Sequence, residues 1–407
     1  MRWGNRLTRS GIIANRVALW TIIGIAVCIG GRNASAQEWK LSTNLSQRVF
    51  YSDNLLLSRN REIESVGFLT TPELLLERTS PTSHIALDGR FEFAEYTNHS
   101  DFNSQDQFLT LDVDQAISER SALRLSANFT RDTTLKSEQD ITGRFLDNSF
   151  RFVSWSVAPT WAYLLSPIDE IAVRASYRDV EYDTDQKTDY QYFGPSIDYS
   201  HRLNELSRVT ATVSVFRFIP AEPGEDHTDT VSTLLGYAYT PSERFSISGG
   251  AGLAYSMRHE DPGNDSSDLG YRLKFNMRYL MNDQTSARMS LSHDTEPSGD
   301  GDQVVRNRAT VGIDHKLTPL TTLRLNVDYA DNIDFLGFEG DSTTDEKTSR
   351  YTSVRPAVSW QLTKDWSLEA QYRFRYRLFE DDGGSASSNS VFLILQYNFP
   401  TLGWTEE

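Results

Sequence analysis

Apolar and polar residues alternate along most of the chain from Trp39 onward. Between 323 and 329 every odd position is apolar and every even position is polar, and 366–376 follows the same rule with the parity reversed. A period of two places the apolar side chains on one face of a strand, whereas a helix would scatter them around its axis. The pattern therefore predicts β-strands with one apolar and one polar face.

Eighteen segments share this alternation. They are 39–51, 66–78, 84–96, 105–117, 122–132, 150–164, 170–180, 189–201, 206–217, 229–240, 243–257, 268–280, 285–294, 304–317, 322–330, 350–362, 366–378 and 389–399. Several contain nine to eleven alternating residues, which is about the length with which a tilted strand crosses a bilayer. An even strand number also places both ends of the chain at the same rim of a barrel.

The connections between these segments alternate in length. The short ones are 80–82, 118–120, 166–169, 202–205, 241–242, 281–283, 318–320 and 363–365. Those between are longer and rich in acids, Gly and Ser, such as 133–149, 218–228, 258–267 and 331–349. Tight turns at one rim and long loops at the other are typical of outer-membrane barrels. We therefore predict an all-β fold, a closed antiparallel up-and-down transmembrane β-barrel. The strands of a soluble propeller or sandwich would also alternate between apolar and polar residues. Such a fold would not require short turns and long loops to follow one another in strict alternation.

Aromatic residues gather near the ends of the predicted strands, where the two water–lipid boundaries should lie. Near the turns are Trp39, Trp161, Tyr163, Tyr199, Tyr239, Tyr279, Trp360 and Trp366. Near the loops are Tyr51, Phe93, Tyr177, Tyr255, Tyr329 and Tyr376. The last segment resembles the C-terminal recognition strand of outer-membrane proteins, except that Pro400–Glu407 follows its final aromatic residue. This strand implies the barrel assembly machinery as a partner.

Residues 1–36 have the features of a secretory signal peptide. Four arginines precede an apolar stretch from Val17 to Ile29, and Ala34-Ser35-Ala36 forms a small-x-small cleavage site. Thirteen residues span roughly 20 Å as a helix, too short for a membrane anchor. A lipoprotein site at Cys28 is the third option, but Val27 precedes it where a small residue is expected. We predict cleavage after Ala36, with the barrel formed by 37–407.

Composition narrows the possible functions. The 407 residues include 40 Lys and Arg against 56 Asp and Glu, a net charge of −16, and such an acidic chain does not suit nucleic acid. The mean hydropathy of −0.48 excludes a bundle of transmembrane helices. Removal of 1–36 takes away the one cysteine and five arginines, which leaves a net charge of −21 and no thiol chemistry.

The alternation also predicts which charges face the barrel lumen. From 268 to 378 the inward bases are Arg272, Lys274, Arg278, Arg288, Arg306, Arg308, Arg324, Arg355, Arg373, Arg375 and Arg377, against the acids Asp314, Asp328 and Glu369. From 66 to 117 the inward acids are Glu73, Glu77, Asp88, Glu92, Asp112 and Asp114, against Arg90. These sets carry net charges of +8 and −5. We therefore expect pore-lining residues that are basic on one wall and acidic on the other.

Three hypotheses fit these walls. Eighteen strands give a backbone diameter of about 36 Å, and inward side chains reduce it to roughly 20–25 Å. The basic wall could guide an anionic polymer, each arginine holding a carboxylate weakly enough to release it. Opposed walls could instead create a transverse field that screens small solutes. The charges could also form pairs between neighbouring strands and have no role in transport, because a water-filled interior tolerates charged residues.

Catalytic and metal-binding motifs are absent from the sequence. The histidines His84, His99, His201, His227, His259, His293 and His315 show no H-E-x-x-H spacing, and no G-x-S-x-G occurs. We expect no enzyme, no catalytic residues, no cofactor and no metal site, although a hydrolase built from sequence-distant residues remains an alternative. The acidic loops 222–229, 259–268, 296–302 and 341–346 would suit Ca²⁺, or Mg²⁺ that bridges lipopolysaccharide. They equally fit a solvated surface.

Two short motifs resemble a known family. Tyr51-Ser52-Asp53-Asn54 and Thr71-Pro72 are similar to the start of the putative β-barrel porin 2 family. The resemblance implies an outer-membrane barrel that accompanies exopolysaccharide systems, with lipid, lipopolysaccharide and polysaccharide export components as partners. We predict an outer-membrane conduit for anionic exopolysaccharide. The alternatives are a general small-solute porin and a non-conducting structural or adhesive barrel.

Overall fold

The computed structural model describes residues 37–134, 149–221, 227–259, 265–299, 301, 303–334, 349–379 and 384–406. The predicted signal peptide 1–36 lies outside these residues and stays a prediction. Within the described part of the chain the strands are β1 (Gln37–Ser52), β2 (Ser65–Thr79), β3 (Ser83–Tyr96), β4 (Ser104–Ser118), β5 (Ser121–Thr133), β6 (Arg151–Leu164), β7 (Asp169–Tyr182), β8 (Tyr190–Asn204), β9 (Ser207–Pro220), β10 (Thr228–Ser242), β11 (Phe245–Arg258), β12 (Ser266–Leu280), β13 (Thr285–Pro297), β14 (Gln303–Thr318), β15 (Thr321–Asp334), β16 (Ser349–Gln361), β17 (Trp366–Phe379), β18 (Ser385–Asn398) and β19 (Leu402–Glu406).

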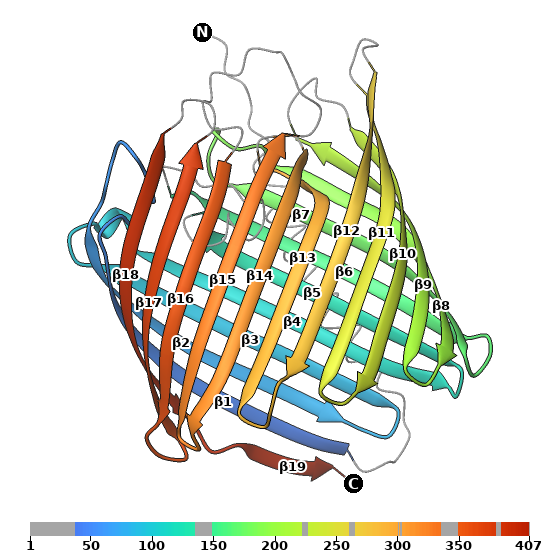
Figure 1. Ribbon diagram of the computed structural model, residues 1–407, viewed down its shortest axis with the longest axis horizontal. Coiled ribbons are helices and arrows are strands. Elements are labelled where there is room, and N and C mark those ends of the chain that lie inside the picture. The colour runs from blue at the N-terminus through green and yellow to red at the C-terminus, as the bar shows by residue number, and fades with distance from the viewer. Residues whose placement is uncertain are drawn as a thin grey trace.

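The strands form one closed antiparallel barrel (Figure 1). Each of β1 to β18 pairs with its neighbours in sequence, and β1 also pairs with β18, with Ser52 opposite Ser390 and Asn44 opposite Asn398. The prediction of a closed eighteen-stranded barrel is thereby confirmed. Closure satisfies the backbone hydrogen bonds that an edge strand would leave open, as a bilayer requires.

One short strand was not expected. After the break around Pro400, β19 pairs antiparallel with the first residues of β1, with Gln37 opposite Glu406 and Leu41 opposite Leu402. Figure 1 shows it beside β1 at the end of the barrel opposite the long loops. The residues that follow the last aromatic therefore continue the closure of the barrel, because β18 and β19 together span the whole length of β1.

The long and short connections lie where the sequence predicted them. Turns at one rim join β2 to β3, β4 to β5 and so on through β16 to β17, and the other rim carries the longer loops. We call these the turn rim and the loop rim. The long strands contain 13 to 16 residues, more than the alternating apolar runs. Backbone pairing thus continues beyond the apolar band into the polar rims.

The outer face of the barrel is apolar. Leu235, Leu269 and Val391 are 70%, 63% and 56% exposed, and the register places the predicted aromatic residues of both rims on this same face. The inner face carries Ser, Thr, Asn and charged residues. The sheet thus turns its apolar side outward, as a barrel in lipid must. None of the helical segments that the structure describes has the length and hydropathy of a membrane-spanning helix.

Candidate functional site: the barrel interior

All of the predicted pore-lining residues lie on the inner face. The pairs Arg278–Arg288 and Arg324–Asp314 connect β12 with β13 and β14 with β15 across this face. The remaining members follow from the same registers: Arg272, Lys274, Arg306, Arg308, Arg355, Arg373, Arg375 and Arg377 on β12 to β17, and Asp88, Glu92, Asp112 and Asp114 on β3 and β4. That they line a conducting pore remains a prediction.

The sequence count overlooked four inward acids. Asp268, Asp294 and Glu296 share the inner face of β12 and β13 with the predicted bases, and the count also missed one inward base, Lys316 on β14. The net charge of the described inward side chains from β12 to β17 therefore falls from +8 to +6. Asp106 faces inward on β4, so the net charge from β2 to β4 becomes −6 rather than −5. Opposed walls remain, but the basic wall is weaker than predicted.

Most of the basic wall is neutralised by nearby acids. Both Arg272 and Lys274 pair with Asp294, at 2.7 and 3.3 Å between nitrogen and oxygen. Other inward ion pairs are Arg288–Asp314, Arg306–Glu296, Arg324–Glu369 and Arg355–Asp328. Cross-strand pairing was one of the three hypotheses, and it describes the majority of these charges.

Within the described residues, two bases of the predicted basic wall neither form an ion pair nor hold a loop. In the described part of the chain no carboxylate lies within ion-pair distance of Arg278 or Arg373. Arg278 is exposed to the interior and lines a cavity of about 440 Å³ together with Arg288, Asn276 and Ser248. Arg373 stacks over the ring of Phe392, with its guanidinium carbon 4.9 Å from the ring centre. Arg278 is therefore open to an anion that enters the lumen, whereas Arg373 is half-buried.

The loop between β1 and β2, residues 53–64, folds into the barrel; we call it the first loop. Leu57 is completely buried there, and its φ of 52° lies in the left-handed region, which costs a leucine about 1–2 kcal/mol. It packs on the inner face of four strands, against Ala330, Tyr351, Phe379 and Ala386. Burial of this side chain offsets the backbone strain, since a buried leucine contributes about 2–3 kcal/mol.

The other apolar residues of the first loop pack on the opposite side of the barrel seam. Leu55, Leu56 and Ile63 are at most 6% exposed, and their cluster includes Leu69, Ala94, Tyr96 and Phe102. The first loop therefore spans the junction of β18 and β1 from inside and narrows the lumen. The sequence contained one overlooked signal, the apolar run Leu55 to Leu57, followed by Ile63, in a loop that is otherwise polar.

Hydrogen bonds fix the first loop to β17 and β18. The Nη2 atom of Arg375 donates to the carbonyl oxygens of Asn54 and Leu55, at 2.9 and 3.1 Å. The Asp53 carboxylate accepts hydrogen bonds from the backbone and side-chain nitrogens of Asn389, at 2.7 and 2.8 Å. Arg375, predicted as a pore-lining residue, is 8% exposed and holds the loop.

A second loop joins distant parts of the loop rim. In 183–189, between β7 and β8, the backbone nitrogen of Thr188 donates to the carbonyl oxygen of Gly299, over 2.7 Å. Gly299 follows β13, and β9 to β12 stand between the two loops. A β-carbon at Gly299 would lie 2.4 Å from the Tyr182 hydroxyl, so a larger residue at this position would require the Tyr182 side chain to move. The lumen is thus partly covered from a second side. The long loop 331–349 lies largely outside the described residues.

Known structures share this architecture. OprC, described as a copper transporter, aligns with a TM-score of 0.50 at 11% identity over 90% of this chain and 66% of its own. The outer-membrane protein opdK of Pseudomonas aeruginosa aligns with a TM-score of 0.46 at 11% identity, over 89% of this chain and 99% of its own. OccK2 (OpdF) of the same species, solved with glucuronate, gives 0.48 at 10% identity, over 88% and 98%.

At such low identities the similarity concerns the fold alone, a large outer-membrane β-barrel. No protein-family model matches the sequence, and no curated protein does.

Proposed function

We propose that this protein is a porin-like conduit of the bacterial outer membrane that prefers small anionic solutes, with acidic saccharides as the cargo class. The single observation that carries this proposal is the presence of Arg278 and Arg373 on the inner face without carboxylate partners among the described residues. Their positive charge lowers the free energy of an anion in the lumen, because low-dielectric walls strengthen the field of an unpaired charge.

The apolar outer face and the closed backbone support a location in a bilayer. In that location the turn rim would face the periplasm and the loop rim the medium, as in other barrels of this type. The family resemblance and its link with exopolysaccharide systems belong to this proposal, as does assembly by the barrel assembly machinery with lipid and lipopolysaccharide as surroundings.

Export of a long acidic polysaccharide is less well supported than passage of short solutes. A polymer ladder would need Arg373, Arg375 and Arg377 to be accessible in sequence along β17. Arg375 and Arg377 are 8% and 1% exposed, and Arg375 is bonded to the first loop. A polymer could use these arginines only after the first loop leaves its position.

Ion selectivity tests the proposal. Reversal potentials across planar bilayers under a KCl gradient should show anion preference for the wild-type protein. The double variant Arg278→Gln/Arg373→Gln should lose most of that preference. Arg244→Gln is the matched control, because Arg244 lies in the turn between β10 and β11 and pairs with Asp283 rather than facing the lumen. Firm cation preference that the double variant leaves unchanged would refute the proposal.

A further inference from the structure

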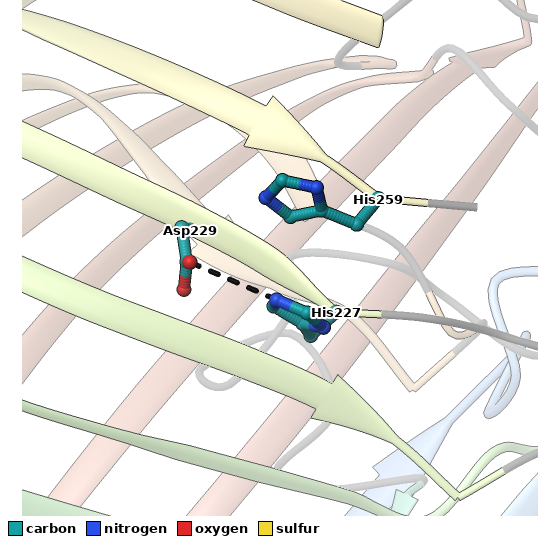
Figure 2. A group of neighbouring side chains, drawn as sticks. All are labelled: His227, Asp229 and His259. Carbon is teal, nitrogen blue, oxygen red and sulfur yellow. Dashed lines mark ion pairs between the residues drawn. The ribbon is translucent and has the colours of Figure 1, made fainter. Parts of the chain in front are cut away.

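Three side chains meet at the loop rim on the outer face of the barrel: His227, Asp229 and His259, which we call the rim cluster (Figure 2). His227 immediately precedes β10, Asp229 is the second residue of that strand, and His259 immediately follows β11. The backbone nitrogen of His259 donates to the carbonyl oxygen of His227 over 3.0 Å, so the two histidines are direct cross-strand neighbours. The antiparallel register thus joins residues that are far apart in sequence.

The geometry of the rim cluster suits a metal ion. One donor atom from each residue lies within 4.8 Å of the other two. The Nε2 atom of His227 is 3.7 Å from the Oδ2 atom of Asp229, too far for a hydrogen bond. Bonds of about 2.0–2.1 Å to a metal keep neighbouring ligand atoms roughly 3.3–4 Å apart. The observed spacing therefore resembles that of two ligands around one ion.

A fourth donor is present beside the cluster. The Oδ2 atom of Asp265, the residue before β12, lies 3.5 Å from the Nδ1 atom of His259. The two imidazole rings have their centres 4.7 Å apart at an interplanar angle of 31°. Two imidazoles and two carboxylates are a ligand set for Zn²⁺ and neighbouring transition metals, whereas Ca²⁺ and Mg²⁺ prefer oxygen ligands alone.

The carboxylate of Asp229 is already held in place. Arg217 on β9 donates two hydrogen bonds to it, both of 2.7 Å. Such a partner fixes the orientation of a ligating carboxylate while leaving lone pairs for an ion. The histidine side chains are 33% and 37% exposed, so an ion from the medium can reach them.

We propose that the rim cluster, with Asp265, binds one divalent transition-metal ion of the zinc class. The ion would join three strand ends at the loop rim, those of β10, β11 and β12. This site lies on the outer face, separate from the lumen, and does not depend on the proposed conduit function.

Zinc binding to the detergent-purified, untagged protein tests this inference. Isothermal titration with Zn²⁺ after chelator treatment should show one site per chain for the wild type. His227→Ala/His259→Ala should weaken the binding tenfold or more. His99→Ala is the matched control, since His99 lies in another loop of the same rim and should leave binding unchanged.

A milder variant protects the test from misfolding. Asp265 is 67% exposed, so Asp265→Asn should retain the fold and weaken Zn²⁺ binding several-fold. Heat-dependent migration in gels and circular dichroism confirm that each variant is folded. Absence of Zn²⁺ binding by the wild type, or equal binding by the wild type and the double-histidine variant, would overturn the inference.

Discussion

Arg375 on β17 donates a hydrogen bond of 2.9 Å to the backbone carbonyl oxygen of Asn54 in the first loop. The same nitrogen atom also donates to the Leu55 carbonyl and lies 3.1 Å from the Ser388 hydroxyl. A residue of the barrel wall thereby fixes a loop that begins more than three hundred positions earlier in the sequence. The lumen width at this level depends on whether these bonds are kept.

Arg375→Met should widen the passage. Methionine occupies a similar volume but donates no hydrogen bond, so two buried carbonyl groups lose their partner at a cost of about 1–3 kcal/mol each. The first loop should then leave its docked position part of the time. We expect a higher mean single-channel conductance with more frequent transitions between levels, measured in planar bilayers.

Arg174→Met provides the control for removal of an inward arginine. Arg174 lies on the inner face of β7 and its Nε atom bonds to Thr160, not to the first loop. The single-channel conductance of the Arg174→Met variant should remain steady, without new transitions between conductance levels. Identical conductance traces for Arg375→Met and the wild type would show that this arginine does not hold the loop.

Leu57→Ala should expose the first loop to protease. Truncation of a fully buried leucine costs about 2–5 kcal/mol, while the left-handed backbone remains as strained for alanine as for leucine. The exposed tip contains Arg59 and Arg61, and the buried residues on either side hold it in place. Trypsin should therefore cleave the variant within this loop much faster than the wild type, as observed by mass spectrometry of the fragments.

The proteolysis result needs a comparison within the same loop. Glu62→Ala changes an exposed side chain of the tip and should leave the cleavage rate within about twofold of the wild type. Equal protection of Leu57→Ala and Glu62→Ala would mean that burial of Leu57 does not dock the loop.

The alternating pattern was sufficient to predict the barrel, because each strand must turn an apolar face to lipid whatever its neighbours are. The segment 366–378 became β17 almost residue for residue, and its arginines face inward as predicted. Strand order also followed, since short turns force consecutive strands to be neighbours. The position of a strand and the face on which each side chain lies depend on neighbouring residues in the sequence, so a period of two reveals them directly.

The contents of the lumen could not be predicted in the same way. Contact of Leu57 with Tyr351, or of Thr188 with Gly299, depends on where loops fold once the barrel has closed. The rim cluster is an intermediate case. Pairing of β10 with β11 places His227 opposite His259, but this contact can be predicted only when the exact last residue of each strand is known. No spacing rule within one segment reveals a contact of this kind.

Trp404→Ala should destabilise the closure of the barrel. The rings of Trp404 on β19 and Trp39 on β1 stack with their centres 5.9 Å apart and an interplanar angle of 4°. Such aromatic pairs contribute about 0.5–1.5 kcal/mol beyond the buried area. We expect a lower temperature for the transition from folded to unfolded migration in gels, with unchanged conductance below that temperature.

Trp360→Ala is the corresponding control, because Trp360 also lies on the outer face near the turn rim and is 51% exposed. Both variants lose contact with lipid, so the difference between them measures the stacking. An equal decrease in both would indicate that β19 adds no stability through Trp404.

Asp189→Asn should stabilise the protein in a pH-dependent way. Burial raises the pKa of the Asp189 carboxyl above its ordinary value, although a hydrogen bond of 2.7 Å from the backbone nitrogen of Tyr182 partly opposes the shift. A carboxyl with a raised pKa in the folded state loses its proton more readily on unfolding. Stability of the wild type therefore falls as the pH rises from about 4 through the raised pKa, and is constant above it.

Asparagine keeps the acceptor oxygen for Tyr182 but carries no charge, so its advantage over the wild type should be absent near pH 3 and fully present at pH 7. Unfolding temperatures across this range give the measurement. Asp185→Asn removes an exposed acid from the same loop and should follow the wild-type profile. A constant offset between Asp189→Asn and the wild type at every pH would exclude titration of Asp189 as the cause, because only a group that changes its protonation on unfolding can give a difference that grows with pH.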